Sequence, residues 1–216
     1  SVVGANLNIA DMIWFIDNTA GGSGGTGTLA DPVLTIGDFN ASADPGVGDN
    51  VYLAETGTAY TDGIVLKNNQ LLIGEGTADS DLVGATGVSY PAHAVALPPI
   101  NGTPPLINST STGISLASDN TVRGLNVTTN GADGIAGSSV GSLMINDMPS
   151  VNTTNGTGID LAGGTWNVDV ASLTVNNTTF SGINRGIGMA TGAGSTSNFG
   201  LVDIATNGAS AIEILA

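Results

Sequence analysis

The sequence predicts an all-β protein, a right-handed, single-stranded parallel β-helix with coils of about 20–28 residues. The first observation is a phrase, Gly-Ile-x-Leu, that begins at Gly63, Gly113 and Gly158 and returns as Gly-Ile-Gly-Met at Gly186. The second is the loosely regular spacing of these phrases along the chain, since another Gly-Ile pair begins at Gly134, between the phrases at Gly113 and Gly158. The third is the near absence of helical patterns among short β-type runs separated by Gly, Asn, Asp and Thr. Leucine-rich repeats need denser Leu and helical repeats need helices, so a β-helix remains.

Within each phrase the Ile and the Leu lie two positions apart, so both side chains point to the same face of a strand. Stacking the coils then predicts two inward ladders and one outward column. The first ladder contains Ile64, Ile114, Ile159 and Ile187, the second contains Leu66, Leu116, Leu161 and Met189, and the outward column contains Val65, Ser115, Asp160 and Gly188.

The residues that flank the phrase predict the corners of each coil. The Gly in front suits a corner where a Cβ would crowd its neighbours or φ must be positive. The corner that follows is expected to contain residues that tolerate left-handed geometry: Asn68, Asn69, Asp119 and Asn120. We also expect stacked Asn side chains to hydrogen-bond along the axis of the helix.

We expect residues 1–216 to form one domain in three parts. Residues 12–62 form an N-terminal capping region and the first coils, with strands over 12–17 and 50–55. A short helix within 34–42 is expected to cap the stack. Residues 106–216 form regular coils, with strands over 124–130 and 172–180.

A proline-rich segment over residues 77–105 interrupts the coil rhythm. It contains five of the eight prolines of the chain, at positions 91, 98, 99, 104 and 105. Since proline cannot donate a ladder hydrogen bond, this segment is predicted to leave the stack as a protruding loop. Loops on rigid scaffolds often carry function, so Tyr90 and His93 within it are a candidate binding loop.

Composition excludes several functions. The chain has 3 Lys+Arg against 18 Asp+Glu and a formal net charge of −15, so it cannot neutralise a nucleic-acid backbone and an anionic membrane would repel it. It has no cysteine, which removes disulfides, Cys-based metal sites and thiol catalysis. No apolar run is long enough for a membrane-spanning helix, so no membrane insertion is expected. The composition fits an extracellular or cell-surface location.

The last residues predict an open coil end. Ile212, Ile214 and Leu215 read as a fresh strand, and no polar segment follows to blunt its edge. The chain also begins without Met, and we expect a mature product or an excised piece. We therefore expect either further coils beyond Ala216 or self-association with a second subunit at this end.

The opening layout resembles that of a known family. The stretches "MIWFIDNTAGGSGGTGTLADPVLTIGDF", "GDNVYLAETGTAYTDGIVLKNNQLLIGEG" and "GISLASDNTVRGLNV" resemble the first coils of right-handed parallel β-helix proteins of the pectin-lyase-like type. In particular they look like bacterial surface and autotransporter-passenger-like proteins. The resemblance covers roughly residues 12–130 and specifies the fold rather than the activity, because this superfamily contains lyases, hydrolases and adhesins.

The resemblance also permits a test of the enzyme hypothesis. Pectate-lyase-like enzymes use an Arg or Lys base beside carboxylates that hold calcium, and this chain offers Lys67, Arg123 and Arg185. Polygalacturonase-like relatives carry paired Asp motifs, a Gly-His-Gly and an Arg-x-Lys, which this sequence lacks. Asp79 and Asp81 are the candidate calcium ligands, and no other cofactor is expected.

These observations favour a non-catalytic structural or adhesive surface module that presents a rigid face to host or surface glycans or proteins. A polysaccharide-active enzyme, of the lyase or glycoside hydrolase type, is the first alternative. A self-assembling filament or lattice subunit that stacks through its coil ends is the second.

Overall fold

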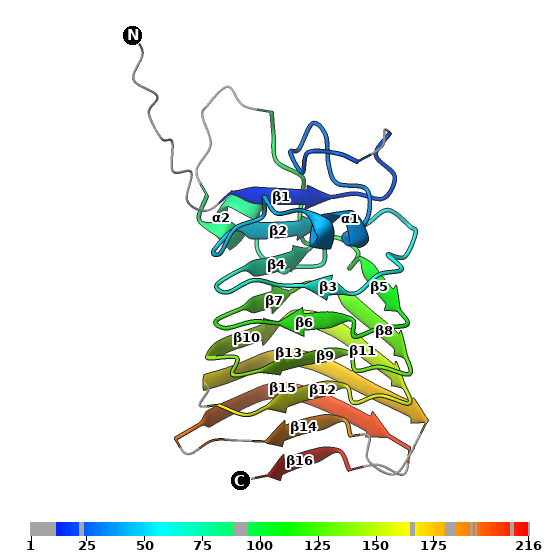
Figure 1. Cartoon of the computed structure of the whole chain (residues 1–216), viewed down its shortest axis with the longest axis vertical. Helices are drawn as coiled ribbons and strands as arrows, with labels where there is room; N and C mark the ends of the chain where they lie inside the picture. Colours follow the sequence, from blue (N-terminus) through cyan, green and yellow to red (C-terminus); the bar gives the residue numbers. More distant parts are fainter. Residues whose placement is uncertain are drawn as a thin grey trace.

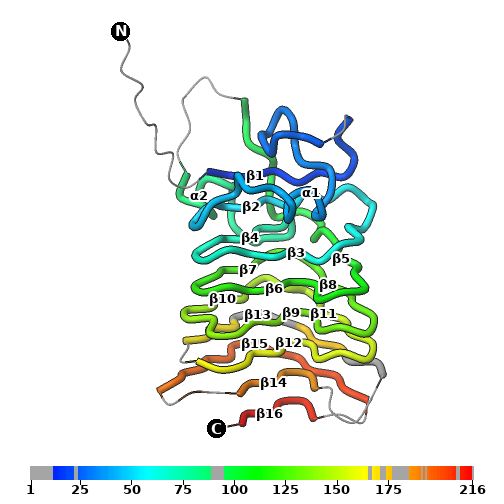
Figure 2. Tube along the Cα trace, viewed as in Figure 1, coloured from blue at the N-terminus to red at the C-terminus, as the bar shows by residue number. Residues whose placement is uncertain are grey.

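The computed structural model describes residues 12–21, 24–88, 95–164, 167–179, 185–190, 192, 194–207 and 210–215. They form a parallel β-solenoid, which confirms the predicted fold class (Figure 1). Strands from successive coils pair side by side in two sheets, one of ten strands and one of six. The stack begins at β1 and reaches β16 at its opposite end, as the coil-by-coil path in Figure 2 shows.

The ten-stranded sheet runs in the order β1-β2-β4-β7-β10-β13-β11-β8-β5, with β15 paired to β13. Its strands are β1 (Ile13–Ile16), β2 (Asn50–Leu53), β4 (Leu71–Gly74), β5 (Leu106–Ser109), β7 (Thr121–Arg123), β8 (Asn126–Asn130), β10 (Ser142–Asn146), β11 (Met148–Thr154), β13 (Asn167–Thr179) and β15 (Thr196–Thr206).

The six-stranded sheet runs in the order β16-β14-β12-β9-β6-β3 and contains the repeated phrase. Its strands are β3 (Ile64–Val65), β6 (Ile114–Leu116), β9 (Ile135–Ser138), β12 (Ile159–Ala162), β14 (Ile187–Ala190) and β16 (Ile212–Leu215). The described residues also form two short helices, α1 (Ile36–Ala41) and α2 (Leu82–Thr86). No helix among the described residues is long and apolar enough to cross a membrane.

The predicted isoleucine ladder is present in the six-stranded sheet. Ile64 pairs in register with Ile114, and Ile159 pairs with Ile187; all four are at most 1% exposed. Ile135 lies between Ile114 and Ile159 in the same column. The column positions 114, 135, 159, 187 and 212 give coils of 21, 24, 28 and 25 residues, as the period predicted.

The second ladder is present with one interruption. Leu161 pairs with Met189 and both are buried, but Gly137 stands between Leu116 and Leu161. A Cβ on Gly137 would lie 2.7 Å from the Val140 side chain, which fills this part of the core. In the outward column, Val65 is 55% exposed as expected, whereas Gly188 is buried because the Arg185 side chain lies over it.

The glycine before each phrase is required by crowding rather than by a positive φ. A Cβ on Gly134 would lie 2.3 Å from Val151 Cγ1 and 2.6 Å from the carbonyl oxygen of Gly158 in the next coil. The same two kinds of contact occur at three more coils, at Gly113, Gly158 and Gly186. Each corner therefore brings backbone of one coil to a distance that no side chain permits.

At the opposite corner, two of the four residues expected to tolerate left-handed geometry have a positive φ, whereas Asn68 and Asn120 do not. Asn69 has φ of 60° and Asp119 has φ of 61°. Asn120 is fully buried, and its Nδ2 donates to the Lys67 carbonyl of the preceding coil at 2.8 Å. Asn68 Oδ1 accepts from the Ser118 amide of the next coil at 3.2 Å. At this corner the asparagine side chains thus bond to the backbone of the neighbouring coil, and the stacked pair expected from the sequence occurs at Asn152 and Asn176 instead.

The N-terminal end of the stack is closed by the chain itself. The outer edge of β1 pairs with the segment 27–33, since Phe15 N donates to Gly27 O and Val33 N donates to Phe15 O, both at 2.9 Å. Helix α1 begins after its N-cap Thr35 and packs Ile36 and Phe39 into the core. The short capping helix predicted within 34–42 is thus confirmed.

Residues 75–105 connect β4 to β5, and the described parts pack on the outer face of the first coils. Leu82 of α2 and Ile100 join an outer apolar cluster with Phe15, Tyr52 and Ile73, separate from the core inside the coils. This outer cluster exists because alternate residues of β1 and β2 point away from the core.

We predict that Ile159→Ala lowers the free energy of unfolding by about 2–5 kcal/mol, because it leaves a cavity in a ladder that neighbours above and below fill. Urea denaturation monitored by circular dichroism measures the change. Val65→Ala removes methyl groups from an exposed side chain of the same sheet and serves as the control, with a change below about 0.5 kcal/mol. An unchanged midpoint for Ile159→Ala would contradict the ladder.

Candidate functional site

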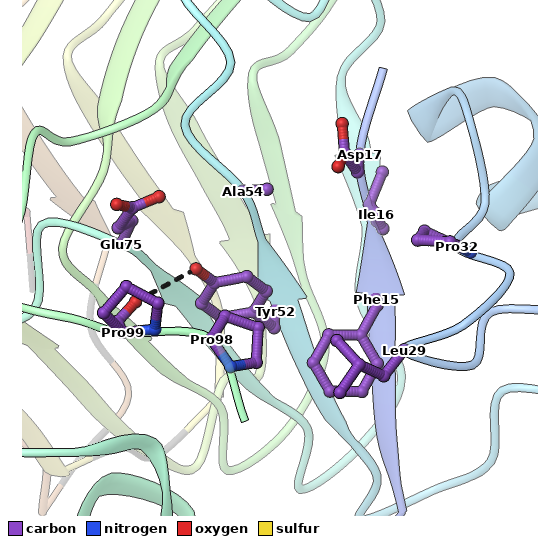
Figure 3. Close-up of a pocket in the computed structure, with 10 residues that line it drawn as sticks. All are labelled: Phe15, Ile16, Asp17, Leu29, Pro32, Tyr52, Ala54, Glu75, Pro98 and Pro99. Carbon is purple, nitrogen blue, oxygen red and sulfur yellow. Dashed lines mark hydrogen bonds between the residues drawn. The ribbon is translucent and has the colours of Figure 1, made fainter. Parts of the chain in front are cut away.

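A pocket of about 180 Å³ lies on the outer face of the first coils, where β1, β2 and β4 end (Figure 3). Strands β1 and β2 provide Phe15 and Tyr52 from the outward positions of their alternating pattern, while Trp14 and Val51 point into the core. The two aromatic rings lie 5.7 Å apart between centroids in a tilted arrangement. The segments 29–32 and 98–99 form the other walls.

Two carboxylates and several apolar side chains line the pocket. In Figure 3 Glu75 lies at the left and Asp17 at the upper right, with Ala54 and Tyr52 between them, and Phe15 and Leu29 lie below Asp17. Asp17 directly follows β1 and Glu75 directly follows β4. The carboxyl ends of stacked parallel strands meet at one edge, which explains why residues 58 positions apart in number, 17 and 75, line one pocket.

Backbone and hydroxyl groups position both carboxylates. Asp17 Oδ1 accepts hydrogen bonds from Thr19 N and Thr19 Oγ1, each at 2.8 Å. Glu75 Oε2 accepts from the Glu55 amide at 3.1 Å. A carboxylate offers about four acceptor sites, so each group retains sites for a ligand.

Two buried tyrosines support this edge. The Tyr52 hydroxyl donates to the Pro99 carbonyl at 3.2 Å and so fastens the proline wall to β2. The Tyr60 hydroxyl lies 3.1 Å from Ile16 O and 2.9 Å from Ala54 O. Burial first, and then the nearby Glu75 carboxylate, raises the pKa of Tyr52 above its usual value. Burial is also the main cause of the raised pKa of Tyr60, so both hydroxyls stay protonated at neutral pH.

The three Lys and Arg side chains of the chain all have contacts away from this pocket. Lys67 Nζ donates to the Pro45 carbonyl, Arg123 forms ion pairs with aspartates, and Arg185 forms an ion pair with Glu213. Within the described residues, no basic side chain forms an ion pair with Asp17 or Glu75.

The candidate binding loop of the sequence, Tyr90 and His93, lies outside the described residues. The two candidate calcium ligands have separate partners. Asp79 forms an ion pair with Arg123 at 2.5 Å, and Asp81 caps α2 by accepting from Gly84 N at 2.7 Å. Among the described side chains, no group of three or more His, Cys, Asp or Glu is arranged to hold a metal ion.

Arg123 lies between two carboxylates that the sequence does not place beside it. Its NH1 contacts Asp79 at 2.5 Å and its NH2 contacts Asp147 at 2.9 Å, with side-chain exposures of 16% for Arg123 and 17% for Asp147. Asp147 lies one coil length after Arg123 in the sequence, so the repeat period of the coils could have indicated that these two residues are neighbours. Asp79 belongs to the segment between β4 and β5, so this ion pair fastens that segment to the coil stack.

A second polar cluster lies on the outer face of the six-stranded sheet. Asp160, Gly188 and Glu213 occupy one column in register, and Arg185 Nε donates to Glu213 across it. Burial first, and then the Asp133 carboxylate, raises the pKa of Asp160 above its usual value, and Arg185 opposes the shift. The structure thus brings Arg185 together with carboxylates from neighbouring coils.

A third feature is a polar ladder on the outer face of β8, β11 and β13. Asn176 Nδ2 donates to Asn152 Oδ1 at 2.8 Å, and Asn152 pairs in register with Thr128 of the coil before. Ser150 Oγ donates to Asn126 Oδ1 at 2.9 Å. Hydrogen bonds between coils therefore hold these side chains in fixed rows.

Comparisons of the chain with protein-family models, curated proteins and solved structures found no match.

We predict that the stability of the fold decreases above a pH of about 10, the usual pKa of tyrosine. The pKa values of Tyr52 and Tyr60 are raised in the folded state, so their contribution is complete below the unfolded pKa and is lost as pH rises towards the folded one. Urea unfolding from pH 8 to 11 measures this decline, which should be shallower for Tyr60→Phe. An identical pH profile for the variant and the parent would rule out the tyrosine origin.

Proposed function

We propose that this protein is an extracellular, non-catalytic structural or adhesive surface module, related to pectin-lyase-like β-helix proteins of the autotransporter-passenger kind. The observation that supports it best is the packing and bonding of one coil to the next. The buried isoleucine ladder runs through successive coils, and the Asn120 bond and the Asn152–Asn176 bond each join one further pair of coils at another place on the stack. Such a stack holds its outer surfaces in fixed positions.

The outer surfaces suit recognition of surface glycans or proteins. The polar ladder around Asn152 presents amides and hydroxyls whose rotamers are already fixed by bonds between coils. Fixed side chains lose little conformational entropy when a partner binds, which favours adhesion. The pocket at Asp17 and Glu75 adds a concave site with apolar walls and a few polar groups, the usual character of a ligand site.

A polysaccharide-active enzyme is the second candidate, and the cluster at Arg185 favours it. A carboxylate with a raised pKa, Asp160, beside an arginine is the kind of pair that acid–base chemistry uses. Against this role, the Arg185 guanidinium is already bound to Glu213 and covers Gly188, so it lies on the sheet rather than at a cleft.

We predict that polygalacturonate and alginate, with and without calcium, release no unsaturated or reducing ends when incubated with the protein. Acidic glycans are also poor partners for a chain of net charge −15. Absorbance of unsaturated products and a reducing-end assay provide the measurement. Cleavage by the parent protein that is lost in Arg123→Ala or Arg185→Ala would contradict the structural role and support the enzymatic one.

A self-assembling subunit is the third candidate, and the last described coil favours it. Ile212 and Ile214 of β16 are 45% and 57% exposed, whereas Ile187 and Met189, their partners in the previous coil, are 1% and 2% exposed because β16 covers them. Val202 and Ile204 of β15 pack against the core but are only partly buried. Coverage of this surface by a second copy or by further coils would bury these side chains.

We expect sedimentation across a concentration series to show association of this chain through the surface of β15 and β16. Ile214→Asp should abolish it, because burying an unpaired carboxylate in the contact is costly. Val65→Asp is the matched control, since Val65 is 55% exposed on the opposite end of the same sheet. A monomer at every concentration would argue against self-assembly.

A further inference from the structure

We propose that the outer face of β7, β10 and β13 binds a neutral pyranose, that is, an uncharged six-membered sugar ring. The Met144 side chain packs against the C–H face of the ring. Ser142, Asn167 and Asp169 bind the hydroxyl groups at its rim. This inference rests on the proposed role as a surface module that recognises glycans, and it names the ligand class and the place of one binding site.

A pocket of about 280 Å³ lies on this face, and it shares no lining residue with the pocket in Figure 3. Ligand pockets begin at about 300 Å³, so this one suits a ligand of the size of a single sugar ring. Strands β7, β10 and β13 are neighbours in the ten-stranded sheet, and each contributes side chains to the pocket.

The side chains that would bind one ring are direct neighbours in the ladder. Met144 pairs in register with Asp169 of the coil after, and Ser142 pairs with Asn167. Paired residues of neighbouring strands lie about 5 Å apart, and alternate residues of one strand lie about 7 Å apart. All four side chains point outward, because the residues between them on each strand are buried. One ring can therefore reach all of them.

Met144 is the feature that points to a ligand. Its side chain is 44% exposed, although the outward side chains around it in the pocket are polar. A methionine side chain is apolar and polarisable, and it adapts to irregular surfaces. A pyranose has the same division, since its ring presents C–H groups on its faces and hydroxyls at its rim. Packing the ring on Met144 removes apolar surface of both partners from water.

The polar groups beside Met144 offer both a donor and an acceptor in fixed positions. Thr196 Oγ1 donates to Asn167 Oδ1 at 2.9 Å, and Asn198 Nδ2 donates to Asp169 Oδ1 at 3.2 Å. Among the described residues, Asn167 Nδ2 and Asp169 Oδ2 have no hydrogen-bond partner. A sugar hydroxyl donates and accepts at once, so it can use the amide donor and the carboxylate acceptor.

Charge selects a neutral sugar over an acidic one. Asp119 and Asp169 both line the pocket, and within the described residues no basic side chain forms an ion pair with either. A uronate would bring a third carboxylate to a chain of net charge −15. A metal ion would leave Met144 unused, and no group of three ligating side chains exists in the described parts of the chain.

Two sources supply a pyranose, a free sugar and one unit of a glycan chain. The polar face continues past the pocket, because Thr196 and Asn198 of β15 stand in register with Asn167 and Asp169. A glycan chain that runs along the stack can place its next unit there, whereas a free sugar uses the pocket alone.

The test is a titration of the folded protein with methyl β-D-glucopyranoside, followed by NMR chemical shifts. All hydroxyls of this sugar are equatorial, so both faces of its ring present C–H groups. We expect a dissociation constant in the range of about 1–10 mM and the largest shifts at residues 142–144 and 167–169. Methyl β-D-glucuronide has the same ring with a carboxylate, and it should bind at least about tenfold more weakly.

Asp169→Ala removes the acceptor and should weaken the glucoside by about tenfold or more. Asp203→Ala is the matched control, since Asp203 is an exposed carboxylate on β15 that pairs with Thr174 outside the pocket, and it should leave the affinity within about twofold. Circular dichroism confirms that each variant is folded, and the comparison of glucoside with glucuronide tests the unaltered protein.

Met144→Ala removes the apolar support of the ring and should weaken the glucoside by about threefold or more. Its control is Val65→Ala, which shortens an exposed apolar side chain of the six-stranded sheet and should leave the affinity unchanged.

No binding of the glucoside, equal binding of the glucuronide, or unchanged affinity in Asp169→Ala would overturn the proposal. Cellotetraose separates the two sources. Tighter binding than the methyl glucoside assigns a glycan chain, and equal binding assigns a single sugar; both outcomes support the pyranose site. Failure of the glucoside to bind would leave the surface-module role standing with protein partners, because that role fails on glycan cleavage instead.

Discussion

Every feature of this protein depends on the spacing between coils, about 4.8 Å in a parallel ladder. At that distance each residue lies directly on the residue that occupies its position in the coil before. Equivalent positions in successive coils form a column, and the side chains in a column must therefore be of a kind that packs well against its own copies. Isoleucine meets this condition inside, asparagine meets it where Asn176 lies on Asn152, and glycine meets it where the backbone of Gly134 approaches that of Gly158.

The same spacing creates a difficulty at β1, because among the described residues no earlier coil offers it a partner. The chain solves it with two devices. The segment 27–33 pairs with the free edge of β1, as another strand would. At β3 a single side chain does the same work, since Asn40 Nδ2 donates to Gly63 O at 2.8 Å and Asn40 Oδ1 accepts from Val65 N at 3.0 Å. An amide side chain has the donor and acceptor of a peptide group, so it can complete a ladder without lengthening the sheet.

Much of the fold could be predicted from the sequence because its determinants are local and repeated. The ladder at Ile114 and Ile159 and the left-handed corner at Asp119 each depend on a short motif that recurs once per coil. Gly188 was less predictable, because the side chain that covers it, Arg185, is positioned by Glu213 in the next coil.

The candidate site was not predictable in the same way. Its residues Asp17, Tyr52 and Glu75 meet only after the coils are in register, and the 98–99 segment then closes over them. The sequence placed the candidate binding loop at Tyr90 and His93, beyond the described residues of the same segment. The ion pair of Arg123 with Asp79 likewise depends on where that segment folds back.

The segment between β4 and β5 shows how a β-helix accommodates extra residues between two of its strands. Ile64 pairs with Ile114 across 50 positions, in the same register that joins Ile135 to Ile159 across 24. The register of the ladder therefore does not depend on the number of residues in a corner. A corner can lengthen without disturbing the core. Here the expansion lies on the outer face of earlier coils and, with them, encloses a pocket that no coil forms alone. In evolutionary terms, a β-helix of this kind can acquire a ligand site by insertion at one corner while the selection that maintains its stability acts elsewhere.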